Sequence, residues 1–457
     1  PGGTGAGTEM ENFMRKAAFH NLGCKVNAYE TEAMEQMLEA AGYEIVPFAP
    51  GADVYVINTC SVTNIADRKS RQMLHRAKKM NPEAVVVAAG CYVQAAGREL
   101  AEKDEAVDIV IGNDRKKELV QILDRYFQEK TTGEEPEDVY LKDLVSPTEY
   151  EELHISRVEE HTRAFIKVQD GCNQFCSYCI IPYTRGRVRS RRPEDVAEEI
   201  RGLAAQGYKE MVLTGIHLSS YGVDFPGGRP GLMDLIAMVH EIDGVERIRL
   251  GSLEPRIITE ESAGFMAGLK KLCPHFHLSL QSGCDETLKR MNRKYTTEEY
   301  LEKCEILRKH FDRPAITTDV IVGFPGETEE EFEQTRAFVE RVHFYEMHVF
   351  KYSRRKGTRA DRMDGQVPEP VKAERSDVLL ELEKTMSEEY RRLWLGETVD
   401  LLLEEESEID GKPVMTGCTR EYVKCVVEKK PGMEKGMMVR GTASKLLDGG
   451  VMEVVTD

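Results

Sequence analysis

The stretch Gln169-Asp-Gly-Cys172-Asn-Gln-Phe-Cys176-Ser-Tyr-Cys179 decides the fold of this chain. Its cysteines have the spacing C-x3-C-x2-C, and three thiolates this close in sequence converge on a metal only from one tight loop. Three ligands leave one corner of a cubane iron–sulfur cluster open to a small molecule. A zinc site would need a fourth Cys or His nearby, and no His lies between Asp170 and Pro193. The spacing favours an open iron–sulfur cluster over a zinc knuckle with a distant ligand or three structural cysteines.

Composition sets the broad class of the protein. The chain has 457 residues, 41% of them hydrophobic, which is enough for two or three domains. A formal net charge of −18 argues against a general nucleic-acid coat protein but leaves room for a local basic site. Its apolar runs are strand-sized, so no membrane span and no signal peptide are expected. Eleven cysteines without a secretory signal predict a reducing, cytoplasmic location.

The first region, residues 15–129, alternates strands and helices. Residues 1–14 are expected to be a tag or a disordered tail. The predicted strands are Ala17–Leu22, Val54–Asn58, Val85–Ala89 and Asp108–Ile111, and the predicted helices are Tyr29–Ala41, Ile65–Met80 and Arg115–Gln128. This alternation predicts a small parallel α/β domain.

Three cysteines follow successive strands of this first domain. Cys24, Cys60 and Cys91 come after the first, second and third predicted strands. The carboxyl ends of parallel strands lie side by side and hold ligands, so we expect these cysteines to meet in one crevice. We interpret them as a second three-thiolate iron–sulfur site with an open iron. The alternative is three small apolar residues packed under loops.

The middle of the chain repeats the alternation at larger scale. Residues 130–160 are acidic and read as a linker, with a short strand near Val139–Leu141. Residues 161–395 contain six predicted strand–helix units. The strands are Phe165–Gln169, Met211–Thr214, Arg247–Gly251, His277–Gln281, Thr317–Val322 and Met347–Lys351, and the helices are Pro193–Gln206, Leu232–Ile242, Glu260–Leu272, Thr297–His310 and Thr328–Val342. Six such units predict a partial (β/α)6 barrel with a cofactor at its strand ends.

The end of the chain changes character. A long charged helix is predicted over Glu369–Leu393. In residues 396–457, short β-type runs at Thr398–Leu403, Val423–Val427 and Met437–Arg440 are punctuated by glycines. About sixty residues of this kind predict a small antiparallel β-barrel.

These three parts resemble the methylthiotransferase family of radical S-adenosylmethionine (SAM) enzymes over nearly the whole chain after the tail. The matching phrases are Leu22-Gly-Cys-Lys-Val-Asn-Ala-Tyr-Glu-Thr31, Asn58-Thr-Cys-Ser-Val-Thr63, Cys172–Arg187, Leu213-Thr-Gly-Ile-His217, Ser279-Leu-Gln-Ser-Gly283, Leu288-Lys-Arg-Met-Asn-Arg-Lys-Tyr295 and Asp319-Val-Ile-Val-Gly-Phe-Pro-Gly-Glu-Thr328. The resemblance implies an amino-terminal cluster domain, a radical SAM core and a TRAM domain, an RNA-binding β-barrel.

Two phrases point to one branch of the family. Gly-Cys-Lys-Val-Asn-x-Tyr-Glu-Thr and Thr-Gly-Ile-His resemble the MtaB-like branch, which acts on N6-threonylcarbamoyladenosine in tRNA. The isopentenyladenosine branch usually has Met at the position of Val26 and Asp-Ser near Tyr29-Glu30. The branch that modifies a ribosomal-protein aspartate is a further alternative.

The resemblance implies a mechanism with two 4Fe-4S clusters and two SAM molecules per turnover. Cys172, Cys176 and Cys179 would bind the cluster that cleaves SAM. Cys24, Cys60 and Cys91 would bind an auxiliary cluster whose extra sulfur a first SAM methylates. A radical from the second SAM would remove hydrogen from carbon 2 of the adenine at tRNA position 37, which then takes the methylthio group. The implied partners are the tRNA anticodon loop and an electron donor such as flavodoxin or ferredoxin.

Residues at the other strand ends are candidates for SAM contacts. Thr214 and Gly215 resemble the segment that accepts the methionine amino group, and a glycine there permits close backbone approach. Ser279, Gln281, Val322 and Gly323 are candidates for ribose and adenine contacts, and Glu254 is a further one. The alternative for each polar residue is a hydrogen bond inside the barrel.

An arginine run directly follows the cluster loop. It consists of Arg185, Arg187, Arg189, Arg191 and Arg192. Arginine forks bind phosphate and carboxylate bidentately, so we predict contact with tRNA or with a cofactor carboxylate, against the alternative of a solvated charge run. A function of another class, a non-enzymatic iron–sulfur protein that binds RNA or carries electrons, is disfavoured because a pure carrier normally closes all four cluster corners.

Overall fold

The computed structural model describes residues 14–144, 149–158 and 162–456, and its chain forms two compact units. The first unit contains residues up to Ser61 together with Ile65–Lys142, and the second contains Val62–Asn64 and the chain from Asp143 onward. Of the predicted tail and linker, residues 1–13, 145–148 and 159–161 lie outside the described part of the chain.

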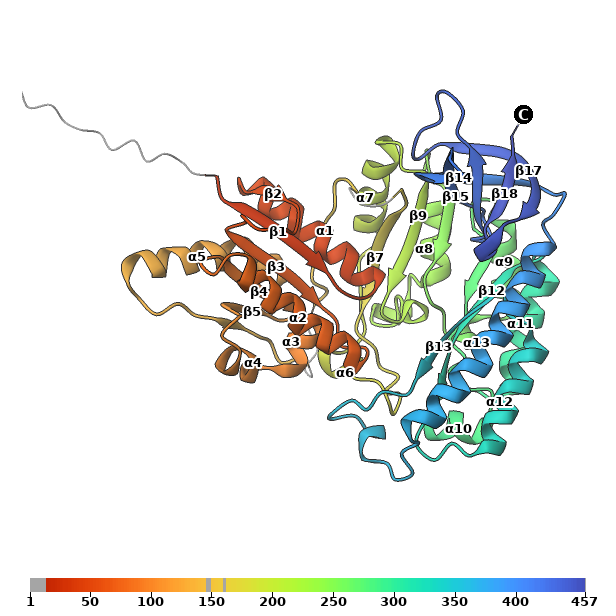
Figure 1. Cartoon of the computed structure of the whole chain (residues 1–457), viewed down its shortest axis with the longest axis horizontal. Helices are drawn as coiled ribbons and strands as arrows, with labels where there is room; N and C mark the ends of the chain where they lie inside the picture. Colours follow the sequence, from red (N-terminus) through yellow and green to blue (C-terminus); the bar gives the residue numbers. More distant parts are fainter. Residues whose placement is uncertain (1–13, 145–148, 159–161, 457) are drawn as a thin grey trace, which may run out of the picture. The chain divides into compact units, whose positions relative to one another are not determined.

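The first unit is built on a six-stranded parallel sheet with the strand order β2-β1-β3-β4-β5-β6 (Figure 1). Its two central strands are buried at every residue, which explains their uninterrupted apolar sequences, Val-Tyr-Val-Ile and Val-Val-Val-Ala-Ala. The strands are β1 (Lys16–Asn21), β2 (Glu44–Val46), β3 (Val54–Thr59), β4 (Val85–Gly90), β5 (Ile109–Ile111) and β6 (Val139–Tyr140). The predicted parallel α/β domain is confirmed.

Helices cover both faces of this sheet. Helices α1 (Lys25–Ala40) and α5 (Leu119–Thr132) share one apolar cluster with the sheet, and residues of α2 (Asn64–Met80), α3 (Cys91–Ala96) and α4 (Arg98–Lys103) share the other. The short elements β2, α3 and α4 were not predicted, because three to six residues are too few for a clear period.

The second unit begins with the predicted partial barrel. One sheet has the order β10-β9-β7-β8 and another the order β11-β12-β13, and parallel bridges at Ile248–Leu272 and Leu253–Leu278 link them. All pairs are parallel except β7–β8. The strands are β7 (Ala164–Asp170), β8 (Arg189–Ser190), β9 (Glu210–Gly215), β10 (Arg247–Leu250), β11 (His275–His277), β12 (Ala315–Val322) and β13 (Glu346–Lys351). Six parallel strands in sequence order confirm the predicted core.

Six helices of the core match their predicted places to within a few residues. They are α7 (Pro193–Ala205), α8 (Leu232–His240), α9 (Glu260–Gly268), α11 (Thr297–His310), α12 (Glu329–Val342) and α13 (Glu369–Arg392). The two short helices α6 (Ile181–Thr184) and α10 (Asp285–Arg290) have no counterpart in the prediction. The fourth strand differs from its prediction. It runs from His275 to His277 instead of His277 to Gln281, because beyond His277 the pairing continues only as isolated parallel bridges at Leu278 and Gln281.

The carboxyl-terminal strands close into a barrel in the order β14-β15-β16-β18-β17. Strand β14 (Thr398–Ile409) pairs with both β15 (Lys412–Cys418) and β17 (Met438–Leu446), while β16 (Lys424–Glu428) and β18 (Met452–Val455) pair in parallel. The predicted small barrel is therefore present, with one parallel pair among antiparallel ones. Among the described residues, no helix combines the length and apolarity needed to cross a membrane.

Candidate functional site: two cysteine-lined loops

The C-x3-C-x2-C loop leaves the end of β7 through a glycine that no other residue could replace. Gly171 has φ +70°, and a Cβ added there would lie 1.8 Å from the carbonyl oxygen of Arg187. The backbone N–H of Cys172 donates to the carbonyl of Gly186 at 3.0 Å, and that of Cys179 donates to the carbonyl of Cys176 at 3.0 Å. The chain is thus folded back on itself so that its three cysteines share one short loop.

The sulfur atoms of this loop receive N–H donors. The backbone N–H of Gln174 lies 3.4 Å from Cys172 Sγ, and Arg293 Nη1 lies 3.4 Å from Cys176 Sγ. Burial raises the pKa of the Cys172 thiol to about 11 and that of Cys179 to about 12. A metal must therefore displace the protons when it binds. Three cysteine sulfurs on a pinched loop, with donors aimed at two of them, fit an iron–sulfur cluster.

Gln169 ties the cluster loop to the end of the next strand. Its Nε2 donates to the carbonyl of Gly171 at 2.7 Å, and its Oε1 accepts from the backbone N–H of His217 at 2.7 Å. A Cβ on Gly215 would lie 2.8 Å from that same Oε1, so the glycine is required for this approach. Thr214 lies buried beside it on β9. The predicted candidates Thr214 and Gly215 therefore adjoin the loop.

His217 is the partly buried histidine next to this strand end. Its Nδ1 lies 2.6 Å from Ser220 Oγ. Burial, helped by the charges of Arg293 and Arg256, lowers the pKa of His217 to about 4. The ring is therefore neutral at physiological pH.

The candidates after the third and fourth strands are held by internal hydrogen bonds. Glu254 accepts from Arg256 Nε at 2.7 Å, and the carbonyl of Ser279 accepts from Tyr295 Oη at 2.6 Å and Arg293 Nη2 at 3.2 Å. The backbone N–H of Gln281 donates to the carbonyl of Asp319 at 2.8 Å. Arg293 thus connects a cluster cysteine to the Ser279 strand end.

The candidates after the fifth strand lie against α13. Val322 is fully buried at the end of β12, and the N–H of Gly323 donates to Glu327 Oε2 at 2.6 Å. Gly323 has φ +70°, and its position leaves no room for a side chain beside Lys372. Both residues are thus buried among their own chain, and their contact with SAM stays a prediction.

A pocket of about 230 Å³ opens within the second unit, beside the cluster loop. Its lining includes Tyr178, which lies between Cys176 and Cys179, and Gln281. The remaining lining residues are Val62, Thr63, Asp319, Ile321, Phe350, Lys351, Tyr352, Ser353 and Arg355. The pocket combines an aromatic and aliphatic wall with two basic side chains and one carboxylate.

The carboxylate in this pocket is held by two histidines from neighbouring strands. Asp319 Oδ2 lies 3.2 Å from His277 Nε2, and Asp319 Oδ1 lies 3.1 Å from His348 Nδ1. Burial alone would raise the pKa of Asp319, but the hydrogen bonds from both imidazoles hold it well below its usual range. The carboxylate therefore stays ionised.

The arginine run differs from its prediction. Arg185 and Arg189 pair with Asp170 at 3.2 and 3.7 Å, Arg191 pairs with Glu199 at 3.0 Å, and all three guanidinium groups are buried. Buried guanidinium groups that are neutralised by carboxylates of their own chain cannot reach a nucleic acid. The predicted tRNA contact is wrong for these three arginines, whose role is to hold β7, β8 and α7 together.

Arg187 and Arg192 are the exposed members of the run. The Arg187 guanidinium stacks on the Phe175 ring, 4.7 Å from its centroid, and Arg192 pairs with Asp195 at 2.9 Å. Their contact with tRNA stays a prediction.

In the first unit, Cys24, Cys60 and Cys91 follow three neighbouring strands. Cys24 precedes α1, Cys60 directly follows β3, and Cys91 directly follows β4. Glycines bring these turns together: a Cβ on Gly23 would lie 3.0 Å from Cys60 Sγ, and a Cβ on Gly90 would lie 2.6 Å from the carbonyl oxygen of Thr59. Cysteines on three turns in such close contact fit a second iron–sulfur cluster.

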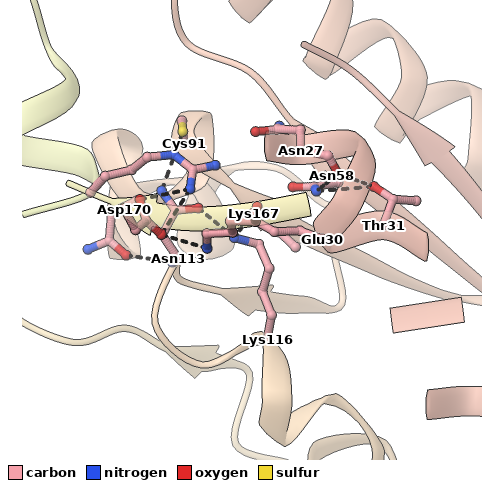
Figure 2. A network of polar contacts seen from close by, with 12 residues as sticks. Asn27, Glu30, Thr31, Asn58, Cys91, Asn113, Lys116, Lys167 and Asp170 are labelled. Atoms are coloured by element: carbon pink, nitrogen blue, oxygen red, sulfur yellow. Dashed lines mark hydrogen bonds and ion pairs between the residues drawn. The ribbon is translucent and has the colours of Figure 1, made fainter. Parts of the chain in front are cut away.

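Buried amides hold these turns in place. Asn27 Nδ2 donates to the carbonyls of Leu22 at 2.9 Å and Thr59 at 3.1 Å, which ties the Cys24 turn to the Cys60 turn. Asn58 Nδ2 in turn donates to the carbonyl of Asn27 at 3.0 Å and to Thr31 Oγ1 at 3.1 Å (Figure 2). Asn27 and Asn58 both lie inside phrases that the sequence singled out, but spacing alone gave them no role.

Two protein-family models match the chain, one over each set of three cysteines. Residues 166–339 match the Radical SAM superfamily, and residues 16–112 match a family described as Uncharacterized protein family UPF0004. Together these matches contain all six cysteines of the two loops.

Curated relatives match most of the length of the chain. The threonylcarbamoyladenosine tRNA methylthiotransferase MtaB of Bacillus subtilis is 42% identical over 90% of both chains. The protein of the same name in Aquifex aeolicus is 39% identical over 93% of this chain and 99% of its own. A tRNA-2-methylthio-N(6)-dimethylallyladenosine synthase of Carboxydothermus hydrogenoformans is 38% identical over 87% and 90%.

Solved structures agree on the fold. The radical SAM methyltransferase TsrM of Kitasatospora setae aligns with a TM-score of 0.54 at 15% identity over 74% of this chain and 73% of its own. Members of the radical SAM superfamily use a 4Fe-4S cluster with SAM, and methylthiotransferases carry a second cluster. The two sets of three cysteines offer thiolates, which are the usual ligands of such clusters. The chain is an enzyme that belongs to the radical SAM methylthiotransferases, in the family's MtaB-like branch.

Proposed function

We propose that this enzyme adds a methylthio group to carbon 2 of N6-threonylcarbamoyladenosine at position 37 of tRNA, next to the anticodon. The observation that carries the proposal is the presence of two sets of three cysteines in one chain, one set on a single loop and one on three neighbouring turns, at 42% identity to a protein named for this activity. A C–H bond on an aromatic ring is strong, so its replacement needs a radical source and a sulfur donor together.

The proposed site residues have distinct tasks. We assign Cys172, Cys176 and Cys179 to the SAM-cleaving cluster and Cys24, Cys60 and Cys91 to the auxiliary cluster. When bound, the clusters and two SAM molecules per turnover supply the radical and the sulfur. Thr214 and Gly215, which adjoin the loop through Gln169, remain proposed contacts for the methionine end of SAM, and Gln281 contributes to the pocket wall beside Tyr178. Glu254, Ser279, Val322 and Gly323 remain proposed contacts at the strand ends.

The choice of substrate within the family rests on sequence. Val26 and Tyr29, which distinguish the branches, are buried in α1. They serve to assign the chain to a branch, and we do not propose them as contacts of the substrate base. The pocket supports the same choice, because Lys351 and Arg355 offer positive charge to the carboxylate of a threonylcarbamoyl group. A second candidate, isopentenyladenosine in tRNA, is favoured by the 38% identity to a dimethylallyladenosine synthase.

The proposed partners follow from this substrate. The carboxyl-terminal barrel, residues 396–457, would bind tRNA as a TRAM domain does. The same chain would supply a radical SAM core in residues 161–395 and a cluster domain in residues 15–129. An electron donor such as flavodoxin or ferredoxin would reduce the clusters. A tRNA substrate also supports a cytoplasmic location.

Mass spectrometry of nucleosides tests the proposal. Anaerobically reconstituted protein, SAM and a reductant would be incubated with tRNA that carries threonylcarbamoyladenosine, and separately with tRNA that carries isopentenyladenosine. We expect a methylthio gain in the first tRNA alone, and none with the Cys176→Ala protein. A gain in the second tRNA alone would overturn the substrate, and a gain in neither from protein with roughly eight irons per chain would overturn the tRNA activity.

A further inference from the structure

One of the six cluster cysteines has a buried side-chain amide aimed at its sulfur. Asn113 Nδ2 lies 3.4 Å from Cys91 Sγ, within hydrogen-bonding distance for a sulfur acceptor. Asn113 is fully buried, and Cys91 is 4% exposed. The two residues are separated by 22 positions in sequence and meet because β5 follows β4 in the sheet.

The orientation of this amide is fixed by a buried ion pair. Lys116 Nζ donates to Asn113 Oδ1 at 2.7 Å and lies 3.0 Å from Glu30 Oε2 (Figure 2). Lys116 and Glu30 are both 0% exposed. An ammonium has donors and no acceptors, so Asn113 must turn its oxygen toward Lys116 and its N–H toward Cys91. A flipped amide would set two donors against each other.

This arrangement polarises the amide toward the sulfur. The carboxylate of Glu30, the ammonium of Lys116 and the amide of Asn113 form a chain in which each group strengthens the next hydrogen bond. Burying Lys116 and Glu30 costs desolvation free energy even though the two side chains pair. Their presence therefore indicates a role that two apolar side chains could not fill. Holding a donor on a cluster thiolate is such a role.

We infer that Asn113 is a positioning residue for the auxiliary cluster: it donates an N–H to the Cys91 thiolate in the orientation set by Lys116 and Glu30, and thereby raises the cluster's reduction potential. The inference rests on the proposed assignment of Cys24, Cys60 and Cys91 to that cluster. A cluster gains negative charge when it is reduced, and the positive end of an N–H dipole stabilises that charge. Hydrogen bonds to cluster sulfurs are among the known determinants of potential.

The neighbouring asparagine provides a contrast. The contact of Asn27 with Cys24 Sγ, at 3.6 Å, is through its carbonyl oxygen Oδ1, because its Nδ2 donates to two backbone carbonyls. Asn58 donates to oxygen atoms, from Asn27 and Thr31. Of these three buried asparagines, Asn113 is therefore the one whose N–H is directed at a cluster ligand.

The test isolates the auxiliary cluster. In the full-length chain with Cys172, Cys176 and Cys179 all replaced by Ala, a redox titration followed by electron paramagnetic resonance gives the midpoint potential of one cluster. We expect Asn113→Leu, which is neutral and similar in size, to shift the midpoint to more negative values. Asn81→Leu, which removes an amide that donates to the carbonyl of Ala52 at 2.9 Å at the amino ends of the strands, away from the three cysteines, serves as the matched control and should leave the midpoint unchanged. An unchanged midpoint in Asn113→Leu overturns the inference.

A second measurement needs no variant of Asn113. With 15N-labelled asparagine in the same three-alanine protein, pulsed electron paramagnetic resonance should detect a nitrogen coupling to the reduced cluster. We expect this coupling to weaken in Lys116→Met, where the amide can rotate. Absence of any asparagine coupling overturns the inference even where Asn113→Leu fails to fold. Neither measurement uses tRNA or SAM. A negative result in either one would therefore refute the role of Asn113 without refuting the proposed methylthiolation.

Discussion

Six cysteines divide into two sets that are held in different ways. Those of the C-x3-C-x2-C loop lie on one segment of eight residues whose backbone is held by hydrogen bonds such as those of Cys172 to Gly186 and Cys179 to Cys176, whereas Cys24, Cys60 and Cys91 depend on contacts between separate turns. Sequence spacing identifies the first set directly. The second set is identified only once the turns are assigned to neighbouring strands.

Alanine substitutions should separate the two sets by chemistry. Cys176→Ala should abolish reductive cleavage of SAM, because it removes a ligand of the cluster that SAM is proposed to meet. Cys60→Ala should spare SAM cleavage and stop sulfur insertion. Release of deoxyadenosine, measured by chromatography next to nucleoside mass spectrometry, checks both. Equal loss of cleavage in the two variants would contradict the division.

His217 predicts a specific pH dependence of stability. Its pKa is lowered to about 4, so between pH 6.5 and pH 4 the unfolded chain binds a proton that the folded chain excludes. This contribution is complete above pH 6.5 and is lost as the pH falls toward 4. Urea unfolding at pH 7 and pH 5 should show a loss about 2 kcal/mol larger in the wild type than in His217→Gln. Equal losses would show that the ring is not held neutral.

At the scale of elements, the sequence pattern predicts the ends of a strand well where every residue of that strand is buried. Strands β3 and β4 are predicted within one residue of their observed ends, because strands buried on both faces read as continuous apolar runs. The barrel strand β15 begins Lys-Pro-Val and lacks such a run, so it was not predicted.

The arginine run shows where pattern alone fails. In the sequence, Arg185, Arg189 and Arg191 have the pattern of an exposed basic patch. Their carboxylate partners, Asp170 and Glu199, cannot be identified from their positions in the sequence. For the same reason Asn113 was not a candidate, since its contact with Cys91 exists only in three dimensions. Sequence therefore offers the six cysteines as candidate ligands but gives no sign of the residues that contact them.

The turn at the end of β7 gives a prediction with an internal control. Gly171→Ala would set a methyl group against the carbonyl of Arg187 and strain a left-handed backbone, so the cluster loop should not form. We expect iron content to fall by roughly half, because a 4Fe-4S site is lost and the other is retained. Gly202→Ala, on the exposed face of α7 with nothing nearby, should keep all its iron and gain about 0.5–1 kcal/mol of stability. Full iron content in Gly171→Ala would refute the argument.

At the scale of the molecule, the carboxyl-terminal barrel is fixed to the core of the second unit by buried polar contacts. Arg249 on β10 pairs with Glu210 at 2.7 Å and donates to the carbonyl of Arg420 at 2.9 Å, while Arg247 donates to the carbonyl of Cys418 at 3.0 Å. Arg420 donates back to the carbonyl of Leu272 at 2.7 Å. The barrel also shares one apolar cluster with α13 and β12.

Breaking this junction should destabilise the protein strongly. Arg249→Met leaves Glu210 buried without its main partner, which costs about 3–5 kcal/mol. Arg440→Ala, which breaks the exposed pair with Asp400 on the same barrel, should lower the free energy of unfolding far less, because solvent screens an exposed ion pair. Urea unfolding compares the two, and limited proteolysis should release the carboxyl-terminal fragment from Arg249→Met alone. Comparable losses in both variants would mean that the junction carries little of the stability.

A barrel fixed in this way keeps a constant distance and orientation relative to the core of the second unit. A tRNA gripped by the barrel would be presented to the core at one offset, so the nucleotide that reaches the pocket would be chosen by distance along the folded RNA as well as by its chemical identity. Lengthening the segment between α13 and β14 would let the distance between barrel and core vary. The enzyme would then select its target nucleotide less accurately, while its affinity for RNA would fall only with longer insertions.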